Sequence, residues 1–254
     1  MDLAQYERIQ PNVTFEGILF NVPNQHCAWR VQTLETKEPD TMAWIRAMKP
    51  GETFFDVGAN MGQYTLVAAK QGLRVIAFEP EAQNFALLIR NLAMNKFASE
   101  VVAFPFCISD VEKIDTLRLS NLMTGGSCHS FASDLNYKRE QKEWAYKQGT
   151  VGFSLDTLCL ELGVQPDHIK VDVDGFEDLV VKGAKGTLPS VKSVLLELDS
   201  ANADHMLARD TLLDMGFVLD QGQVEAARRK EGAFVGIGNH IFRREQAKDT
   251  ASNA

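Results

Sequence analysis

The stretch Phe54-Phe55-Asp56-Val57-Gly58-Ala59-Asn60-Met61-Gly62-Gln63-Tyr64-Thr65 decides the fold of this chain. An apolar run ends in an acid, a glycine turn follows and a helical pattern opens, which is typical of a ligand-binding turn in a parallel sheet. Gly58 permits the tight turn, and Gly62 is expected to let a ligand approach the backbone closely. A dinucleotide fingerprint would carry its central glycine where Asn60 stands. The pattern therefore disfavours a pyrophosphate, whereas the Asp56 carboxylate would attract an ammonium or sulfonium group.

From Thr53 onward, strand patterns alternate with helix patterns, which predicts an α/β fold with helices on both faces of a parallel sheet. We expect residues 51–244 to form one domain, since a chain of 254 residues is within the usual size of one. The alternation fails between Asp110 and Gly152, and residues 120–147 are expected to be a lid-like insertion. The predicted strands are 53–57, 73–79, 101–106, 168–173, 193–199, 216–220 and 236–243, and the predicted helices are 63–71, 83–96, 155–162, 176–182 and 202–214.

Residues 1–50 are predicted to be an N-terminal extension. The apolar, β-branched runs Val13–Phe20 and Cys27–Thr33 flank a turn-forming segment, which predicts a β-hairpin. A short helix is expected over Asp40–Met48, before a Pro-Gly pair that ends helices. The polar segment 245–254 is expected to be a disordered tail.

Charge and composition argue against several classes of partner. The chain has 26 Lys+Arg against 34 Asp+Glu, a formal net charge of -8, so neither nucleic acid nor an anionic membrane is an expected partner. No segment resembles a signal peptide or a membrane span, and the four cysteines are widely spaced without a zinc-ligand pattern. We expect a cytoplasmic protein, and the sequence is compatible with a homo-oligomer.

A second acid, Glu79, ends the next predicted strand, 21 residues after Gly58. A carboxylate at this spacing can accept both ribose hydroxyls of a nucleoside. A glutamate at a strand end is weak evidence by itself, but its position after the Asp56-x-Gly58-x-Asn60 turn makes it strong. The two elements together predict a nucleoside-containing cofactor.

Charged side chains also share one face of a predicted central strand, where Lys170, Asp172 and Asp174 alternate with apolar residues. A central parallel strand is buried on both faces, so these charges need a reason. One explanation is an ion pair between Lys170 and Asp172 with an exposed strand end; the other is a ligand crevice lined by the acids. Four predicted strands end in carboxylates, at Asp56, at Glu79, at Asp172 with Asp174, and at Glu197 with Asp199.

Taken together, these motifs resemble the FkbM-type S-adenosylmethionine-dependent methyltransferases. The resemblance covers roughly residues 38–242, and Asp174 departs from it because the family usually carries Glu there. That difference shortens one side chain in the acidic cluster. The matching segments are Asp56–Thr65, Phe78-Glu79-Pro80, Ser154–Leu158, Lys170-x-Asp172-x-Asp174-Gly175-x-Glu177 and Lys182-Gly183-Ala184.

The resemblance implies a Rossmann-like class I methyltransferase fold, with a seven-stranded, mostly parallel sheet whose last strand, Gly238–Arg243, runs antiparallel. It also implies S-adenosyl-L-methionine as the methyl donor, bound along the carboxyl ends of the strands. The expected cofactor-binding residues are Asp56, Gly58, Asn60 and Gly62 near the methionine part, Glu79 on the ribose, Ser109 and Asp110 near the adenine, and Thr65 and Pro80 from the same motifs.

The activity implied is O-methylation of a hydroxyl group on a small molecule, such as a sugar or a secondary metabolite. The methyl group arrives activated, so the protein must position the acceptor and remove its hydroxyl proton. Asp172 is the first candidate for the base and Asp174 the second; Glu177 is a weaker one because it also suits the helix dipole, and Lys170 would neutralise the cluster. Two close carboxylates could instead hold Mg²⁺, but no ligand set is complete in the sequence and we do not expect a metal.

Two other classes of protein remain alternatives. A catalytically inert cofactor-binding protein or scaffold would keep the nucleoside site, although it would not need the additional carboxylates around Asp172. An NAD-dependent oxidoreductase is disfavoured by Asn60 in the position of the central glycine.

Overall fold

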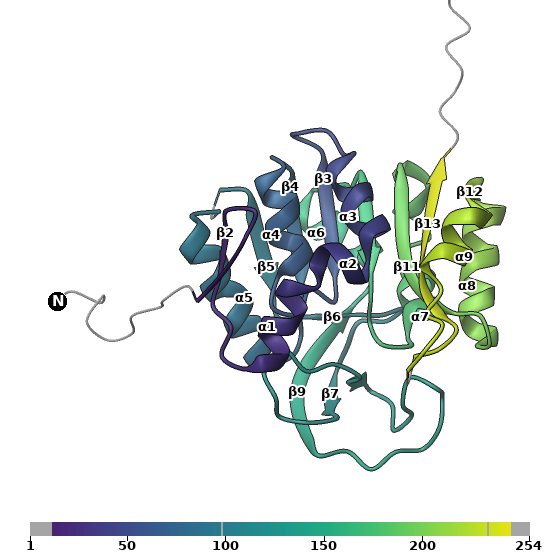
Figure 1. Ribbon diagram of the computed structural model, residues 1–254. Helices are drawn as coiled ribbons and strands as arrows, with labels where there is room; N and C mark the ends of the chain where they lie inside the picture. Colours follow the sequence, from purple (N-terminus) through teal and green to yellow (C-terminus); the bar gives the residue numbers. More distant parts are fainter. Residues whose placement is uncertain (1–11, 98, 233, 245–254) are drawn as a thin grey trace, which may run out of the picture.

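The computed structural model describes residues 12–97, 99–232 and 234–244, and Figure 1 shows the chain coloured from the N- to the C-terminus. Residues 1–11 and the segment 245–254, for which a disordered tail was predicted, lie outside the described residues.

A seven-stranded sheet forms the centre of the molecule, in the order β12-β13-β11-β10-β3-β4-β5. Every strand is parallel to its neighbours except β13, which is antiparallel to both β11 and β12. This confirms the predicted class I methyltransferase topology with its antiparallel last strand. The strands are β3 (Thr53–Val57), β4 (Arg74–Phe78), β5 (Val101–Phe104), β10 (His168–Val171), β11 (Ser193–Asp199), β12 (Phe217–Leu219) and β13 (Ile237–Arg244).

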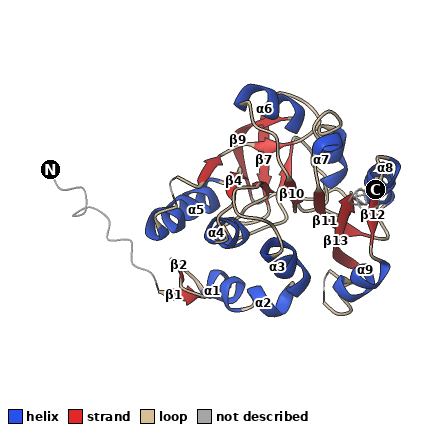
Figure 2. Ribbon diagram, turned by 90° about the horizontal axis from the view of Figure 1, so that it is seen from above, coloured by secondary structure: helices blue, strands red, loops and turns tan. Residues whose placement is uncertain are grey.

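Helices cover both faces of this sheet (Figure 2). Successive side chains of β3 alternate between the two apolar cores: Phe54 packs in the core under α3, α4 and α5, and Phe55 in the core under α6, α7 and α8. The helices are α3 (Pro39–Arg46), α4 (Gln63–Lys70), α5 (Ala82–Asn95), α6 (Leu155–Leu162), α7 (Glu177–Lys182), α8 (Ala203–Asp214) and α9 (Gln221–Ala227), and Leu188–Ser190 form a 3₁₀ turn.

The N-terminal extension contains a hairpin, but a smaller one than predicted. Its strands, β1 (Val13–Phe15) and β2 (Ile18–Phe20), both lie within the first apolar run. The prediction of a strand at Cys27–Thr33 is wrong, because α1 (Gln25–Gln32) occupies that segment and α2 (Leu34–Lys37) follows it. The Asn24 side chain accepts a hydrogen bond from the Cys27 backbone N–H at 2.8 Å and so caps α1, while apolar side chains one turn apart enter the core.

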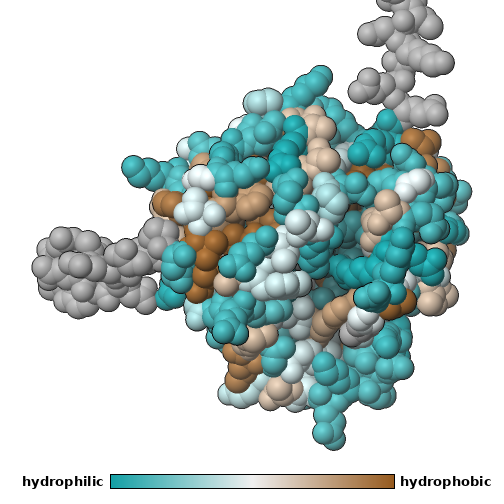
Figure 3. Space-filling model, viewed as in Figure 1, coloured by the Kyte–Doolittle hydropathy of each residue, from teal (hydrophilic) through white to brown (hydrophobic). Residues whose placement is uncertain are grey.

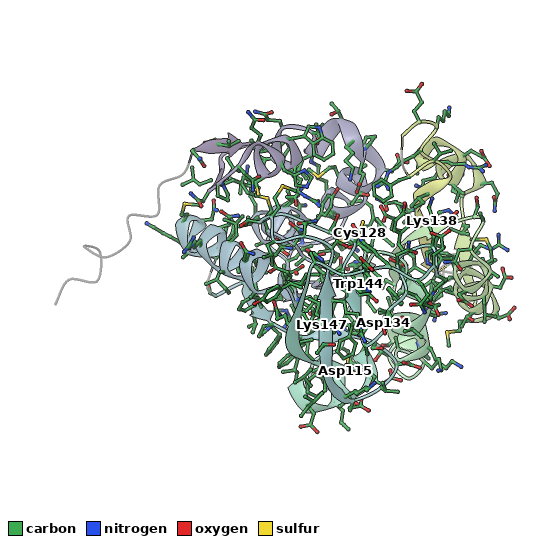
Figure 4. The ribbon with its side chains drawn as sticks, turned by 90° about the horizontal axis from the view of Figure 1, so that it is seen from below. Asp115, Cys128, Asp134, Lys138, Trp144 and Lys147 are labelled. Carbon is green, nitrogen blue, oxygen red and sulfur yellow. The ribbon has the colours of Figure 1, made fainter. Side chains whose placement is uncertain are left out.

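Residues 107–153, which include the predicted insertion 120–147, form a second sheet in the order β6-β9-β7-β8. Its longest strands pair antiparallel and extend below the central sheet in Figure 1. Figure 4 shows them from below, with Asp115 on one and Lys147 on the other. The strands are β6 (Cys107–Ile108), β7 (Lys113–Leu119), β8 (Ser130–Phe131) and β9 (Tyr146–Phe153).

Candidate active site

A cavity of about 490 Å³ opens at the carboxyl ends of the central strands. Gly58 after β3, Glu79 after β4 and Asp172 after β10 lie on its wall, together with residues of α1 and of the insertion. This is the edge of a parallel α/β sheet at which ligands bind, and the volume is within the ~300–1,000 Å³ of small-molecule sites.

The turn after β3 is shaped by two residues with positive φ. Gly58 has φ +82°, and a Cβ there would lie 1.9 Å from the Asp172 backbone oxygen, so only glycine fits. Asn60 has φ +50°; its backbone N–H donates to Glu79 Oε2 at 2.8 Å and its side-chain Nδ2 donates to the Gly126 carbonyl at 2.9 Å. Asn60 therefore joins the turn both to the acid after β4 and to the insertion.

Glu79 is a buried acid whose remaining hydrogen-bonding capacity faces the cavity. Its Oε2 accepts the Asn60 N–H at 2.8 Å and its Oε1 accepts the Glu81 N–H at 2.9 Å. Burial raises the pKa of Glu79 to about 7, against the effect of these two backbone N–H groups. A carboxylate has about four lone-pair sites, so each oxygen can accept one further donor. This arrangement fits a pair of neighbouring ribose hydroxyls.

Pro80 and Ser109 also lie on this part of the wall, where Phe78 and Phe106 add aromatic surface. Asp110, predicted near the adenine, is not among the lining residues, because its carboxylate pairs with Lys182.

Three other residues predicted to contact the cofactor lie behind the wall. Gly62 is the N-cap of α4 with φ +89°, and a Cβ there would lie 2.4 Å from Leu88 Cδ1, so its close approach is to α5 and not to a ligand. The side chains of Asp56 and Thr65 are fully buried, and Thr65 Oγ1 donates to Asp56 Oδ2 at 2.6 Å.

Lys170 lies at the centre of the buried charges. Its Nζ is 3.4 Å from Asp172 Oδ2 and 3.7 Å from Asp56 Oδ1, and its side chain is 1% exposed. Burial lowers the pKa of Lys170, but the charges of Asp172 and Asp56 outweigh this effect and hold it above its usual value. The ion pair that the sequence left open is therefore present, and at the same time Asp172 lies on the cavity wall.

Asp174 follows Asp172 on the wall in a left-handed conformation, with φ +57°. Its Oδ2 accepts the Cys128 backbone N–H at 2.6 Å, and no residue in the described part of the chain donates to its Oδ1. Burial, reinforced by the charge of Asp172, raises the pKa of Asp174 to about 7.

Glu177 is fully buried and does not line the cavity. Its carboxylate accepts the backbone N–H groups of Val173 at 3.0 Å and Gly175 at 3.1 Å, so it holds the loop on which Asp172 and Asp174 lie.

The insertion covers this loop. The Tyr137 backbone packs against Gly175, where a Cβ would lie 2.7 Å from Tyr137 Cα. The Arg139 guanidinium lies 4.5 Å from the centre of the Phe176 ring and pairs with Asp178 of α7. That this cover acts as a lid stays a prediction.

The glycine stretch Gly125-Gly126 of the insertion is held in place by several hydrogen bonds. The Gly125 N–H donates to Asn84 Oδ1 at 2.7 Å, and the Gly126 carbonyl accepts the Asn84 and Asn60 amides. Any opening of the lid would therefore involve the segment beyond these glycines.

Some residues on the wall were not predicted. Arg229 pairs with Glu197 at 2.6 Å and with Glu38 at 3.4 Å, and Arg30 and Trp29 of α1 also line the cavity. Neither the short basic run around Arg229 nor the α1 segment carried a motif. Within residues 12–97, 99–232 and 234–244, no group of three or more His, Cys, Asp or Glu side chains is arranged to hold a metal ion.

The residues present fit S-adenosylmethionine. Glu79 can accept two hydroxyls, aromatic side chains lie beside it, and the acids Asp172 and Asp174 lie further along the wall, where they suit a cationic group. The glycine turn at Gly58 lies between the two parts, since β3 is between β4 and β10 in the sheet.

The sheet topology and this cavity define a Rossmann-like, class I methyltransferase. The protein belongs to the FkbM methyltransferase family, since the family described as "Methyltransferase FkbM domain" matches residues 56–219. The hexuronic acid methyltransferase AglP of Haloferax volcanii is 23% identical over 181 residues, which are 70% of this chain and 69% of that protein. Family and fold imply S-adenosylmethionine as the methyl donor.

Among solved structures, the SAM dependent methyltransferase from Agrobacterium tumefaciens is similar in fold. The TM-score is 0.50 at 12% identity, over 93% of this chain and 69% of that one. Hydrophilic side chains predominate on the face shown in Figure 3, and no helix in the described part of the chain is long and apolar enough to cross a membrane.

Proposed function

We propose that this protein transfers a methyl group from S-adenosylmethionine to a hydroxyl oxygen of a sugar-type small molecule. The family and the fold support the methyl transfer, and the similarity to a hexuronic acid methyltransferase supports a sugar acid as the acceptor. The observation that favours oxygen as the methylated atom is the Asp174 carboxyl on the cavity wall, because a hydroxyl acceptor needs a base.

Bound S-adenosylmethionine supplies a methyl group already activated by its sulfonium. The residues of this chain therefore have to orient the acceptor hydroxyl, exclude water and take up one proton. Asp174 Oδ1 is the atom that we assign to the proton, since Oδ2 is occupied by the Cys128 N–H. A base with a pKa of about 7 combines a useful ionised fraction with sufficient basicity near neutral pH.

Asp172 is the weaker candidate for the base, although the sequence alone favours it. Lys170 Nζ lies 3.4 Å from its Oδ2, so this carboxylate is already engaged in an ion pair, whereas Asp174 Oδ1 has no donor among the described residues. We assign Asp172 instead to the cationic part of the cofactor, beside the turn at Gly58. Lys170 and Asp56 then act behind the wall by fixing the position of Asp172.

Glu79 is the residue that we assign to the ribose, with Asn60 holding it in place through a 2.8 Å hydrogen bond. Pro80, Ser109 and Phe106 would surround the adenine end of the cavity.

Label transfer tests this function. The protein is incubated with S-adenosylmethionine carrying an isotope-labelled methyl group and with a panel of hexuronic acids, the matching neutral sugars and phenolic metabolites. Mass spectrometry with fragmentation then locates the label. We expect a labelled methyl ether on a sugar acid with the wild type and with Asp210→Asn, a surface control, but not with Asp174→Asn. A label on a carboxylate or nitrogen atom, or on no sugar, would contradict the proposal.

A further inference from the structure

Among the described residues that line the cavity, Arg30 is the one lysine or arginine without an ion pair. Lys37 pairs with Glu38, and Arg229 pairs with Glu197 and Glu38. Arg30 Nε donates to the Gly125 carbonyl at 2.9 Å and to His26 Nε2 at 3.2 Å. The terminal nitrogens Nη1 and Nη2 have no partner in the described part of the chain, so this guanidinium can still bind an anion.

The backbone around Arg30 ties it to the cofactor turn. Its carbonyl accepts the Gln63 side-chain amide at 3.3 Å, and Gln63 is the first residue of α4, directly after the turn. Its other support, Gly125, precedes Gly126, whose carbonyl accepts the Asn60 amide. Arg30 is therefore held from both sides against the turn that carries Gly58 and Asn60.

A carboxylate lies within electrostatic range of this guanidinium. Burial raises the pKa of Asp174 most strongly, and the positive charge of Arg30 acts in the opposite direction. Asp172 lies on the same wall. The Arg30 guanidinium and the two acids thus line the same cavity. An α-amino acid is complementary to this arrangement, because its carboxylate and its ammonium group are attached to one carbon atom.

We propose that Arg30 binds the carboxylate at the amino-acid end of S-adenosylmethionine, while Asp172 receives the ammonium group of the same end. This inference rests on S-adenosylmethionine being the methyl donor, and it is independent of the acceptor. It gives the N-terminal extension a direct part in the cofactor site, through α1.

Two ligands that differ only beyond the thioether sulfur test this assignment by calorimetry. S-adenosylhomocysteine carries the amino-acid end, whereas 5′-methylthioadenosine lacks it. We expect Arg30→Gln to weaken S-adenosylhomocysteine binding at least about tenfold and to leave 5′-methylthioadenosine within about twofold, as for loss of a charge-assisted hydrogen bond. Arg30→Lys should recover part of the loss. Arg209→Gln, which removes an arginine from the surface of α8, should leave both affinities unchanged.

Several outcomes would overturn the inference. Equal losses for both ligands would indicate a general disturbance of the site. An unchanged S-adenosylhomocysteine affinity combined with a raised KM for an acidic sugar would assign Arg30 to the carboxylate of the acceptor, and a raised KM for a phosphorylated sugar would assign it to a phosphate. A wild-type protein that binds neither nucleoside would overturn the proposed function itself, and this inference with it.

Discussion

Glu177 Oε2 and His205 Nε2 lie 3.0 Å apart beneath the loop that carries the two acids of the cavity wall. His205 Nδ1 accepts the Asp199 backbone N–H at 2.9 Å, so the ring proton resides on Nε2, the nitrogen next to Glu177. Glu177 in turn accepts the N–H groups of Val173 and Gly175. This chain of contacts anchors the loop to β11 and α8, and it explains why a glutamate that does not line the cavity belongs to the motif.

Glu177→Gln is therefore expected to destabilise the protein. The amide has nearly the same shape but places an NH₂ group where a carboxylate oxygen accepts a buried N–H group, and leaving a buried donor without its acceptor costs about 1–3 kcal/mol. The free energy of unfolding, measured with urea, should fall by about 2 kcal/mol. Glu161→Gln, an exposed substitution on α6, is the matched control; equal stability of the two variants would show that Glu177 does not hold the loop.

Glu79 and Asp56 should respond differently to the same kind of change. Glu79→Gln, on the cavity wall, should weaken S-adenosylhomocysteine binding at least about tenfold, because it removes a charged acceptor of the ribose hydroxyls. Asp56→Asn, behind the wall, leaves Lys170 with one fewer counter-charge and should mainly lower Tm. Calorimetry and thermal unfolding of both variants distinguish the two roles, and a larger loss of affinity in Asp56→Asn would reverse them.

The ligand-free protein should lose stability as the pH rises from about 5 to 8. Burial raises the pKa of both Glu79 and Asp174 to about 7, whereas in the unfolded chain such groups titrate near pH 4. Burial also raises the pKa of Glu197 to about 8, whereas it lowers the pKa of His129 and that of His240 to about 4, which acts in the opposite direction below about pH 6.5. The three carboxyl groups outweigh the two imidazoles, so the folded state binds more protons in this interval and stability falls with increasing pH. The pKa of Glu38 and that of Glu52 are lowered to about 2, so these two groups act below this range.

Thermal unfolding across this range, in buffers of equal ionic strength, measures the effect. Tm should fall by a few degrees between pH 5.5 and pH 8 in the wild type and in Asp210→Asn, and by less in Asp174→Asn. A Tm that is constant or rises over the same interval would contradict the raised pKa values.

The lid can be tested through Arg139, which joins the insertion to α7 through Asp178. Arg139→Gln should raise the acceptor KM several-fold and leave the affinity for S-adenosylhomocysteine nearly unchanged, because it loosens the cover over Phe176 and α7 while the ion pair with Lys170 still holds Asp172 in place. Lys138→Gln, on the adjacent residue, is the control, since the Lys138 ammonium lies over the Tyr137 ring and has no ion pair within the described residues. A fall in cofactor affinity in Arg139→Gln would mean that the insertion is part of the cofactor site.

The central fold could be predicted from the sequence because its signals are local. The apolar runs at β3 and β4 and the glycine turn between β3 and α4 need no knowledge of distant partners. The second sheet could not be predicted from the sequence, because β7 and β9 pair across more than twenty intervening residues that carry no strand signal. α1 was mistaken for a strand because Trp29 and Val31 favour strands, although Asn24 carried a usable capping signal. Asp220 gave the same kind of signal for α9.

The candidate site, like the fold, could be predicted in part. Parallel strands bring the acids that follow them to one edge, so the proximity of Glu79, Asp172 and Asp174 followed from the pattern alone. The pattern could not predict which side chains face the cavity and which lie behind its wall. Asp56, for example, is turned towards Thr65 and Lys170 by packing that no motif encodes. Arg30 was missed because its segment carries no motif and was predicted to be a strand.

The kcat of Asp174→Asn, measured with the acceptor that label transfer identifies, tests the central claim most directly. This variant keeps the shape of the side chain and removes its basicity, so kcat should fall about 100-fold or more while the affinity for S-adenosylhomocysteine changes by less than about threefold. In the wild type, kcat should rise with pH through about 7, as the Asp174 carboxyl loses its proton. A wild-type kcat in Asp174→Asn, or a fall of the same size that is matched by loss of cofactor binding, would contradict the assignment of Asp174 as the base.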